Sequence, residues 1–383
     1  MYCEKKSQPD TLRIIITDKA WLLDLMHIIR QCVVMMHKRL ELIERELMRV
    51  LPGHADISWL DIASSGITGN PDLDIVDLFC EPSRDLIRRG GKRWRPLLMV
   101  LVCEMLGGEG ASGRAYQLSP VVELPHTGSL IIDDIEDGSD MRRGEPAVHM
   151  KYGIDLAINA GNLLYYLPTI CIDQADIPDA MKLQVYQIYS AYLRRVHFGQ
   201  GFDIAWHRDH CYIPDTASYE LMCRMKTGCL AAMAAEIGAA CAEAPKEQIT
   251  QAGRIAETLG LAFQIIDDVR NLETGNPGKR RGDDLLEGKK SLPLIIHLDS
   301  HPDGRKNMLD EIKSLRTSFL AHAQIPQDRI EAVIGIMQDS GAVAEARNRA
   351  EELFGEVVKE VHTVYPNSAA RKEFLSLVAQ FMA

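Results

Sequence analysis

Two acidic motifs, each placed directly after an apolar run, constrain this chain more than any other feature of its sequence. The first is LIIDDIEDGSDMRRGEPAVH over 130–149, and the second is FQIIDDVRN over 263–271. Two carboxylates about 4 Å apart at a partly buried site repel each other by roughly 4 kcal/mol. The folded chain must therefore supply positive charge at both motifs.

The sequence around the motifs predicts an all-α protein. Leu, Ala, Met, Glu, Lys and Arg dominate long stretches, and apolar residues recur at spacings of three and four, as in LELIERELMRVL over 40–51. Alternating β-branched patterns are nearly absent. Breakers such as GGEGASG from 107 and TGNPG from 274 separate the periodic segments. We expect roughly a dozen helices and no significant sheet.

Length and composition allow a large core in one big domain or two smaller ones, because 46% of the 383 residues are hydrophobic. Residues 1–78 show helical periodicity without a chemical constellation. We therefore predict an N-terminal helical extension over 1–78 and a main domain over 79–383. The most apolar early segment, over 20–36, contains Asp24, His27 and Arg30, so no membrane anchor is expected.

Charge and cysteine content narrow the class of protein. The net charge of −11 argues against a nucleic-acid-binding protein, because such proteins need a basic face to neutralise phosphates. The nine cysteines form no CxxC pair and do not indicate a zinc site or a disulfide framework. A reducing cytoplasmic location is therefore expected.

The first acidic motif suits a metal ion if residues 118–137 form one helix. Asp133 and Asp137 would then lie one turn apart on one face, with Asp134 displaced by about 100°. Oxygen ligands without a nearby His or Cys select Mg²⁺ over zinc. A single motif of this kind is more often a solvated helix face, but two copies after apolar runs favour metal binding.

Basic residues gather where anions could bind. The stretch SRDLIRRGGKRWRP over 83–96 places six Arg and Lys side chains around a Gly-Gly pair. Glycine lets backbone amides approach an anion closely, and arginine presents a planar fork that fits phosphate oxygens. With the two acidic motifs, these residues predict two anion sites in one cavity, one bridged by metal and one held directly by Arg and Lys.

These motifs resemble the trans-isoprenyl diphosphate synthases, the family of farnesyl and geranylgeranyl diphosphate synthases. The resemblance covers about residues 80–300 and is carried by GGKRWRP, ELPHTGSLIIDDIEDGSDMRRGEPAVH, GQGFD, MKTG, FQIIDDVRN and GKRRGDDLLEGKKSLP. It implies an isoprenoid synthase fold of antiparallel helices around a deep central cavity, usually as a homodimer. The implied reaction is a Mg²⁺-dependent, head-to-tail condensation of an allylic diphosphate with isopentenyl diphosphate.

The resemblance also implies roles for matching residues. The isopentenyl diphosphate would be held by Lys92, Arg95, His126 and Arg143. Three Mg²⁺ ions would be bound by Asp133, Asp134, Asp137, Asp267, Asp268 and Asn271. The allylic diphosphate would contact Arg142, Lys226, Thr227, Gln264, Asn271, Lys279 and Lys289. Lys226 joins the five aspartates in the expected catalytic set. The family reaction requires no side-chain nucleophile, since the double bond of isopentenyl diphosphate attacks the allylic cation and the released diphosphate removes a proton.

Two positions depart from the usual pattern of the family. Asn271 stands where many relatives have a third aspartate, and GNLL over 161–164 has Gly-Asn where Gly-Asp is more usual. The DDxxN form resembles geranylgeranyl diphosphate synthases of the eukaryotic type. An amide oxygen can still contact Mg²⁺ or its bound water.

Product length is expected to depend on Gly128 and Ser129, one turn before the first motif. A helical turn rises about 5.4 Å, close to one isoprene unit, so a bulky residue there would stop growth near about fifteen carbons. Tyr165 and Tyr166 are candidates for a deeper floor. The sequence favours a twenty-carbon product, with a longer chain as the alternative.

Two other functions are less favoured. A class I terpene cyclase binds one diphosphate and would not need GGKRWRP or the second lysine-rich segment. A non-catalytic partner subunit would be expected to lose metal or diphosphate ligands.

Overall fold

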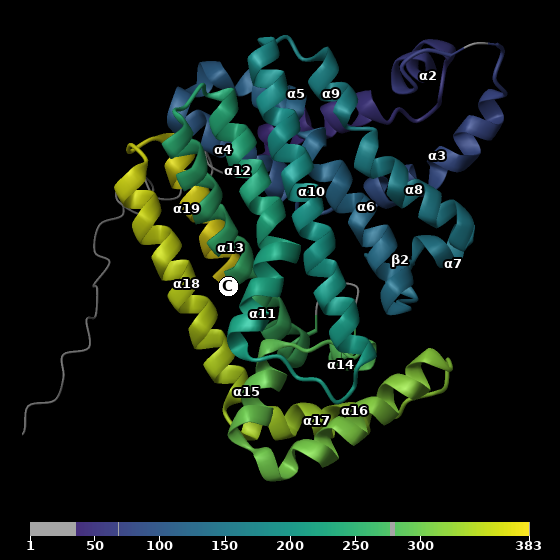
Figure 1. Cartoon of the computed structure of the whole chain (residues 1–383), viewed down its shortest axis with the longest axis vertical. Coiled ribbons are helices and arrows are strands. Elements are labelled where there is room, and N and C mark those ends of the chain that lie inside the picture. The colour runs from purple at the N-terminus through teal and green to yellow at the C-terminus, as the bar shows by residue number, and fades with distance from the viewer. Residues whose placement is uncertain (1–35, 68, 276–279, 383) are drawn as a thin grey trace, which may run out of the picture.

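The computed structural model describes residues 36–67, 69–275 and 280–382, and their regular structure is almost entirely helical (Figure 1). The predicted all-α class is confirmed. Lys279 and most of the apolar segment over 20–36 lie outside these ranges. Across the described residues, no helix is both long enough and apolar enough to span a bilayer.

The first part of the chain leads into the first acidic motif. Its elements are a helix over 36–50, α2 (Ile57–Ala63), α3 (Leu73–Arg88), α4 (Trp94–Gly107), the 3-10 turn η1 (Glu109–Ala111), α5 (Ser112–Leu118) and α6 (Pro120–Asp137). A two-residue antiparallel hairpin follows, formed by β1 (Met141–Arg142) and β2 (Glu145–Pro146). The hairpin returns Arg142 to the last turns of α6, where it pairs with Asp134.

The middle of the chain builds the long helices of the bundle. These are α7 (Val148–Tyr152), α8 (Ile154–Tyr166), α9 (Thr169–Gln174), α10 (Asp179–Arg208), α11 (Thr216–Cys223), the π-helical turn η2 (Arg224–Gly228), α12 (Cys229–Cys241) and α13 (Lys246–Glu273). The last part comprises α14 (Asp283–Glu287), α15 (Leu292–Ser300), the 3-10 turn η3 (Pro302–Gly304), α16 (Arg305–Leu320), α17 (Gln327–Asp339), α18 (Ala342–Val364) and α19 (Ala369–Met382). Figure 1 shows α14 to α17 together at one end of the bundle.

The core centres on α12, which is buried along almost its whole length between α4, α10 and α13. Small side chains make this possible. Gly238 leaves no room for a Cβ because the backbone of Met99 on α4 lies against it. A helix without a polar face can only persist inside such a shell of other helices.

Both acidic motifs occupy the C-terminal turns of long helices. Asp137 is the last residue of α6, and Gly138 ends that helix in the left-handed conformation with φ of +70°. This φ favours glycine, which has no Cβ to clash. The predicted single helix through the first motif is therefore observed, beginning at Pro120. The second motif occupies the end of α13 in the same way.

The helix over 36–50 shares the core of the main body. Ile43 and Leu47 are 0% exposed. Arg39 forms buried ion pairs with Glu104 of α4 at 2.6 Å and Glu373 of α19 at 2.9 Å. The predicted boundary after residue 78 falls inside α3, so the division into an extension and a main domain stays a prediction about sequence organisation.

Replacing Arg39 is expected to destabilise the fold strongly. The Arg39→Ala variant leaves Glu104 and Glu373 buried together without their cation, which typically costs about 3–5 kcal/mol. Urea unfolding followed by circular dichroism measures the change. Arg45→Ala is the matched control, since Arg45 is exposed on the same helix and its removal should cost less than about 0.5 kcal/mol. Equal losses in both variants would contradict a stabilising role for the buried cluster.

Candidate active site

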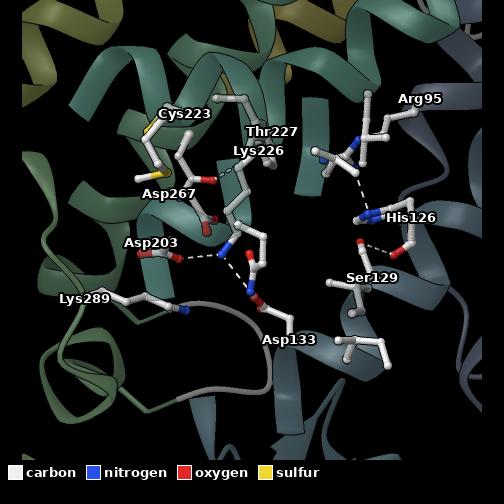
Figure 2. Close-up of a pocket in the computed structure, with 18 of the residues that line it drawn as sticks. Arg95, His126, Ser129, Asp133, Asp203, Cys223, Lys226, Thr227, Asp267 and Lys289 are labelled. Atoms are coloured by element: carbon white, nitrogen blue, oxygen red, sulfur yellow. Dashed lines mark hydrogen bonds and ion pairs between the residues drawn. The ribbon is translucent and has the colours of Figure 1, made fainter. Parts of the chain in front are cut away.

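A cavity of about 440 Å³ opens between the central helices (Figure 2). Its wall is formed by the start of α4, the C-terminal half of α6, the middle of α10, the η2 turn, the end of α13 and the segment over 284–291. In Figure 2, Arg95 and His126 lie on one side, while Lys226, Asp203 and Asp267 lie on the other. The cavity thus has two chemically different ends.

Asp133 is the residue of the first motif that reaches into the cavity. Its Oδ1 accepts hydrogen bonds from Lys226 Nζ at 3.0 Å and Gln200 Nε2 at 2.9 Å. Burial alone would raise the pKa of Asp133, but Lys226, Lys289 and Arg142 outweigh burial and hold that pKa well below its usual value. Asp133 is therefore an ionised carboxylate at neutral pH.

The other two aspartates of the motif lie behind the cavity wall. Asp134 is 0% exposed and accepts a hydrogen bond from Arg142 Nε at 2.8 Å. Asp137 is 1% exposed and lies 3.0 Å from Lys289 Nζ. Burial raises the pKa of Asp137 to about 7, although the Lys289 charge opposes that rise. Each acid is thus matched with its own cation.

The second motif presents Asp267 and Asp268 to the cavity from α13. Asp268 Oδ2 accepts hydrogen bonds from the Tyr219 hydroxyl at 2.6 Å and the Leu292 amide at 3.1 Å. Burial raises the pKa of Asp268 to about 7. Asn271 lies one turn further along α13 and is 0% exposed, and neither polar atom of its side-chain amide has a hydrogen-bond partner among the described residues.

Lys226 and Thr227 enter the cavity from the π-helical turn η2. Such turns widen a helix locally and often occur at functional sites. Gly199 on α10 permits the close approach, because a Cβ there would collide with the backbone of Lys226. Lys226 Nζ bridges Asp133 at 3.0 Å and Asp203 at 2.6 Å. Burial would lower the pKa of Lys226, but these two carboxylates raise it, so the ammonium stays charged.

The opposite end of the cavity carries an excess of positive charge. Arg95 NH1 donates to His126 Nε2 at 3.2 Å, and Arg143 NH1 donates to the Leu86 carbonyl at 2.8 Å. Burial lowers the pKa of Arg95 and of Arg143 to about 10 each. Burial and these two arginines hold the pKa of His126 well below its usual value, so His126 is a neutral acceptor. Lys92, at the same end, is exposed.

The structure brings most of the predicted site residues into one cavity. Those in its wall are Lys92, Arg95, His126, Ser129, Asp133, Arg142, Arg143, Tyr165, Lys226, Thr227, Gln264, Asp267, Asp268 and Lys289. Asp134, Asp137 and Asn271 are buried outside the wall, and Lys279 lies outside the described residues. The roles assigned to these residues stay predictions.

Two residues of the predicted chain-length pocket are placed elsewhere, which corrects the sequence interpretation. Gly128 lies at the crossing of α6 and α8, where a Cβ would come within 2.7 Å of the Gly161 carbonyl oxygen. It allows helices to pack and does not open the cavity. Tyr166 is 72% exposed on the outer face of α8, whereas Tyr165 faces the cavity and is 9% exposed. Asn162, the departure in GNLL, is also exposed on α8.

Sequence reasoning assigned no role to several further polar residues of the wall. Gln200 and Asp203 face the first motif from α10, and Glu136 accepts a hydrogen bond from Gln200 at 2.6 Å. The signal for Gln200 and Asp203 is the motif GQGFD, whose spacing of three puts both on one helix face. Tyr219, which holds Asp268, has no such local signal.

Comparison with known proteins finds a matching family and similar sequences. A family model described as polyprenyl synthetase matches residues 76–324. A geranylfarnesyl diphosphate synthase from Aeropyrum pernix is 34% identical over 307 residues, which are 78% of this chain and 92% of that protein. A geranylgeranyl diphosphate synthase from Sulfolobus acidocaldarius is 33% identical over 253 residues, 65% of this chain and 74% of that protein.

The fold is similar to a solved structure as well. The crystal structure of geranylgeranyl pyrophosphate synthetase from Pyrococcus horikoshii Ot3 superposes with a TM-score of 0.76 at 23% sequence identity. The superposition covers 92% of this chain and 98% of that one. The overall arrangement of the helices is therefore shared.

The neutral state of His126 predicts a loss of stability in acid. The unfolded chain takes up a proton on this histidine below about pH 6.5, whereas the folded chain does not, so the free energy of unfolding falls by up to about 1.4 kcal/mol per pH unit. His126→Gln should make the acid loss smaller by this contribution, while other histidines with lowered pKa values, such as His207, keep theirs. Urea unfolding of the substrate-free protein between about pH 7.5 and about pH 5.5 measures the difference.

The control for this titration is His362→Gln, since His362 is exposed near the end of α18. It should retain the acid loss of the wild type. An identical pH dependence in His126→Gln and the wild type would show that the ring is protonated in the folded state.

Proposed function

The chain belongs to the polyprenyl synthetase family, and we propose that its cavity condenses an allylic diphosphate with isopentenyl diphosphate to give geranylgeranyl diphosphate. As a member of this family it is a prenyltransferase that acts head to tail. One observation carries the assignment of substrates to the cavity: the acidic motifs with Lys226 lie at one end, and Arg95 with its neighbours lies at the other.

The acidic end is proposed to hold the allylic diphosphate. Lys226, Lys289 and Arg142 are already fixed by carboxylates, so they need little reorganisation when charge develops on the leaving diphosphate. Fixed cations in a water-poor site are the effective form of electrostatic stabilisation. Thr227 donates its hydroxyl hydrogen to Gln264 Oε1 at 2.7 Å, which leaves the Gln264 amide to contact Asp268.

The donor set at this end fits Mg²⁺. Asp133, Asp267 and Asp268 present oxygen ligands to the cavity, Asp137 lies behind them, and the unpartnered amide of Asn271 is nearby on α13. We assign three ions to these groups, with Asp134 acting through Arg142. Among the described residues no three His, Cys, Asp or Glu side chains converge as a complete metal site. Substrate phosphate oxygens and water would complete each shell, as is usual for Mg²⁺.

Bound Mg²⁺ would neutralise the charge that develops as the bond between the allylic carbon and its diphosphate oxygen breaks. The basic end would hold isopentenyl diphosphate through Lys92, Arg95 and Arg143, with neutral His126 as a hydrogen-bonding partner. Its double bond then forms the new carbon–carbon bond with the allylic cation. A proton leaves the resulting cation for the released diphosphate, which acts as the base. The nucleophile is the double bond of isopentenyl diphosphate, so the protein supplies neither.

Product length is proposed to depend on Ser129 and Tyr165. Both line the cavity, and the Tyr165 ring lies against His197 with centroids 5.2 Å apart. We infer that this pair forms the floor of the cavity and limits the product to twenty carbons. A longer product is the alternative, since one relative is named for geranylfarnesyl and another for geranylgeranyl diphosphate.

An exposed apolar surface supports a homodimer. Ile154 and Ile158 on α8 are 57% and 42% exposed, and Leu183 and Phe198 on α10 are 60% and 64% exposed. We infer that these exposed large apolar residues belong to an interface with another subunit, because large exposed apolar surfaces often mark such interfaces. Sedimentation equilibrium should give a species of two chains, and Phe198→Glu should shift it toward one chain. A wild-type monomer at micromolar concentration would contradict this.

The rival functions differ in what the basic end must do. A terpene cyclase acts on one diphosphate and would have no second anion for Lys92, Arg95 and Arg143 to bind. Arg95 is buried, and a buried charge needs a partner of opposite charge. A partner subunit would not need Lys226 held between two carboxylates. Retention of both ends therefore favours a synthase.

Mass spectrometry of the products tests the proposed function. Purified protein is incubated with Mg²⁺, labelled isopentenyl diphosphate and each allylic diphosphate in turn. A twenty-carbon diphosphate is expected, and longer products would keep the chemistry but change the length. Turnover of geranylgeranyl diphosphate alone would indicate a cyclase, and no condensation with any primer would refute synthase activity.

Enlarging residue 129 should shorten the product. Ser129→Phe places a ring in the cavity one helical turn from Asp133, so growth should stop near about fifteen carbons. The ratio of product lengths from the same assay measures the effect. Ser129→Ala is the matched control and should keep the wild-type length. An unchanged distribution in Ser129→Phe would place the growing chain along another wall.

A further inference from the structure

Arg93 lies between Lys92 and Arg95 of the basic end in the same cavity wall, and its buried side chain is held by acceptors within the protein. Its side chain is 2% exposed, while Lys92 is exposed and Arg95 faces the cavity. Three acceptors hold the Arg93 guanidinium. Nε donates to Glu44 Oε1, NH1 to Glu123 Oε1 and NH2 to the Ile87 carbonyl, each at 2.7 Å. The acceptors come from three separate helices.

These contacts fix the shape of the turn over 90–93. Arg93 has a φ of +46°, a left-handed conformation that residues other than glycine rarely adopt. A residue keeps such a conformation only when its surroundings hold it there. Gly91 in the same turn lies against the Arg143 guanidinium, where an added Cβ would be 3.0 Å from NH2. The position of the turn therefore determines how Lys92, Arg95 and Arg143 lie relative to one another.

Glu44 is the contact that comes from outside the matched family region. It belongs to the helix over 36–50, which precedes the match over 76–324. Burial of Ile43 and the Arg39 ion pairs anchor this helix, so the Glu44 carboxylate is presented to Arg93 from a fixed backbone. The Glu44 side chain is 42% exposed and is absent from the cavity wall.

We propose that Glu44 is a positioning residue for isopentenyl diphosphate, acting through Arg93 on the turn that presents Lys92 and Arg95. This inference rests on the proposed function, since it assumes that the basic end binds that substrate. Glu123 remains beside Arg93 when Glu44 is changed, so the guanidinium stays paired and buried. The substitution removes the second carboxylate that fixes the direction of the Arg93 guanidinium. The turn over 90–93 then gains freedom to move.

The predicted signature is a selective loss at one substrate. Glu44→Gln should raise the KM for isopentenyl diphosphate by about threefold to tenfold. The effect is modest because the Glu44 side chain is partly exposed, which weakens its ion pair with Arg93. The KM for the allylic diphosphate and the midpoint of thermal unfolding should stay near the wild-type values. Glu41→Gln is the matched control, since Glu41 is exposed and, within the described part of the chain, pairs with His37 on the same helix.

A second variant tests whether Glu44 acts through Arg93. If it does, adding Glu44→Gln to Arg93→Lys should weaken binding by less than Glu44→Gln alone does in the wild type. Equal effects in the two backgrounds would overturn the route through Arg93. So would an equal rise of both KM values, an unchanged KM in Glu44→Gln, or the same rise in Glu41→Gln.

Equilibrium dialysis separates this inference from the proposed function. Labelled isopentenyl diphosphate is dialysed against each protein with EDTA, so that binding at the basic end is measured without metal or turnover. If the wild type binds it but forms no product, the proposed function fails, and the dissociation constants still decide the role of Glu44. A wild type that does not bind isopentenyl diphosphate would overturn both.

Discussion

The bridge that Lys226 forms between Asp133 and Asp203 is the interaction on which the rest of the site depends. It joins η2, α6 and α10 at one point inside the cavity. Without its ammonium, two carboxylates from different helices would face each other in a partly buried space and drive those helices apart. Gly199 lets the backbone of η2 approach α10 closely, and this approach brings the Lys226 ammonium to the two carboxylates. Helix packing and charge pairing therefore both fix the position of Asp133 of the first motif.

The two ends of the cavity solve opposite problems. At the acidic end, nearby cations hold the pKa of Asp133 low, so this carboxylate is charged, whereas burial raises the pKa of Asp137 to about 7. At the basic end, cations outnumber carboxylates, and burial lowers the pKa of Arg95 and Arg143. That excess of positive charge is relieved when an anion arrives. The two ends therefore differ in charge balance, because carboxylates and cations are paired at the acidic end and cations are in excess at the basic end.

Sequence reasoning reached the helical class, the helix through the first motif and most of the cavity wall. These follow from periodicity and from motifs whose residues lie close together in the chain. It misplaced Gly128 and Tyr166 because the face of a helix that meets a cavity depends on which neighbour packs against the other faces. Tyr219 was missed for a related reason, because its partner Asp268 is 49 residues away. Contacts across such distances leave no local pattern.

An acidic protein with a net charge of −11 would repel diphosphates at long range, but screening limits that repulsion to about 8 Å at physiological ionic strength. Inside the cavity the local arrangement decides. Glu44 and Glu123 direct Arg93 into the protein, and Lys92 and Arg95 on either side remain turned toward the substrate space. Carboxylates at the basic end thus do not weaken anion binding. They fix the direction of one cation so that its neighbours point where the substrate can meet them.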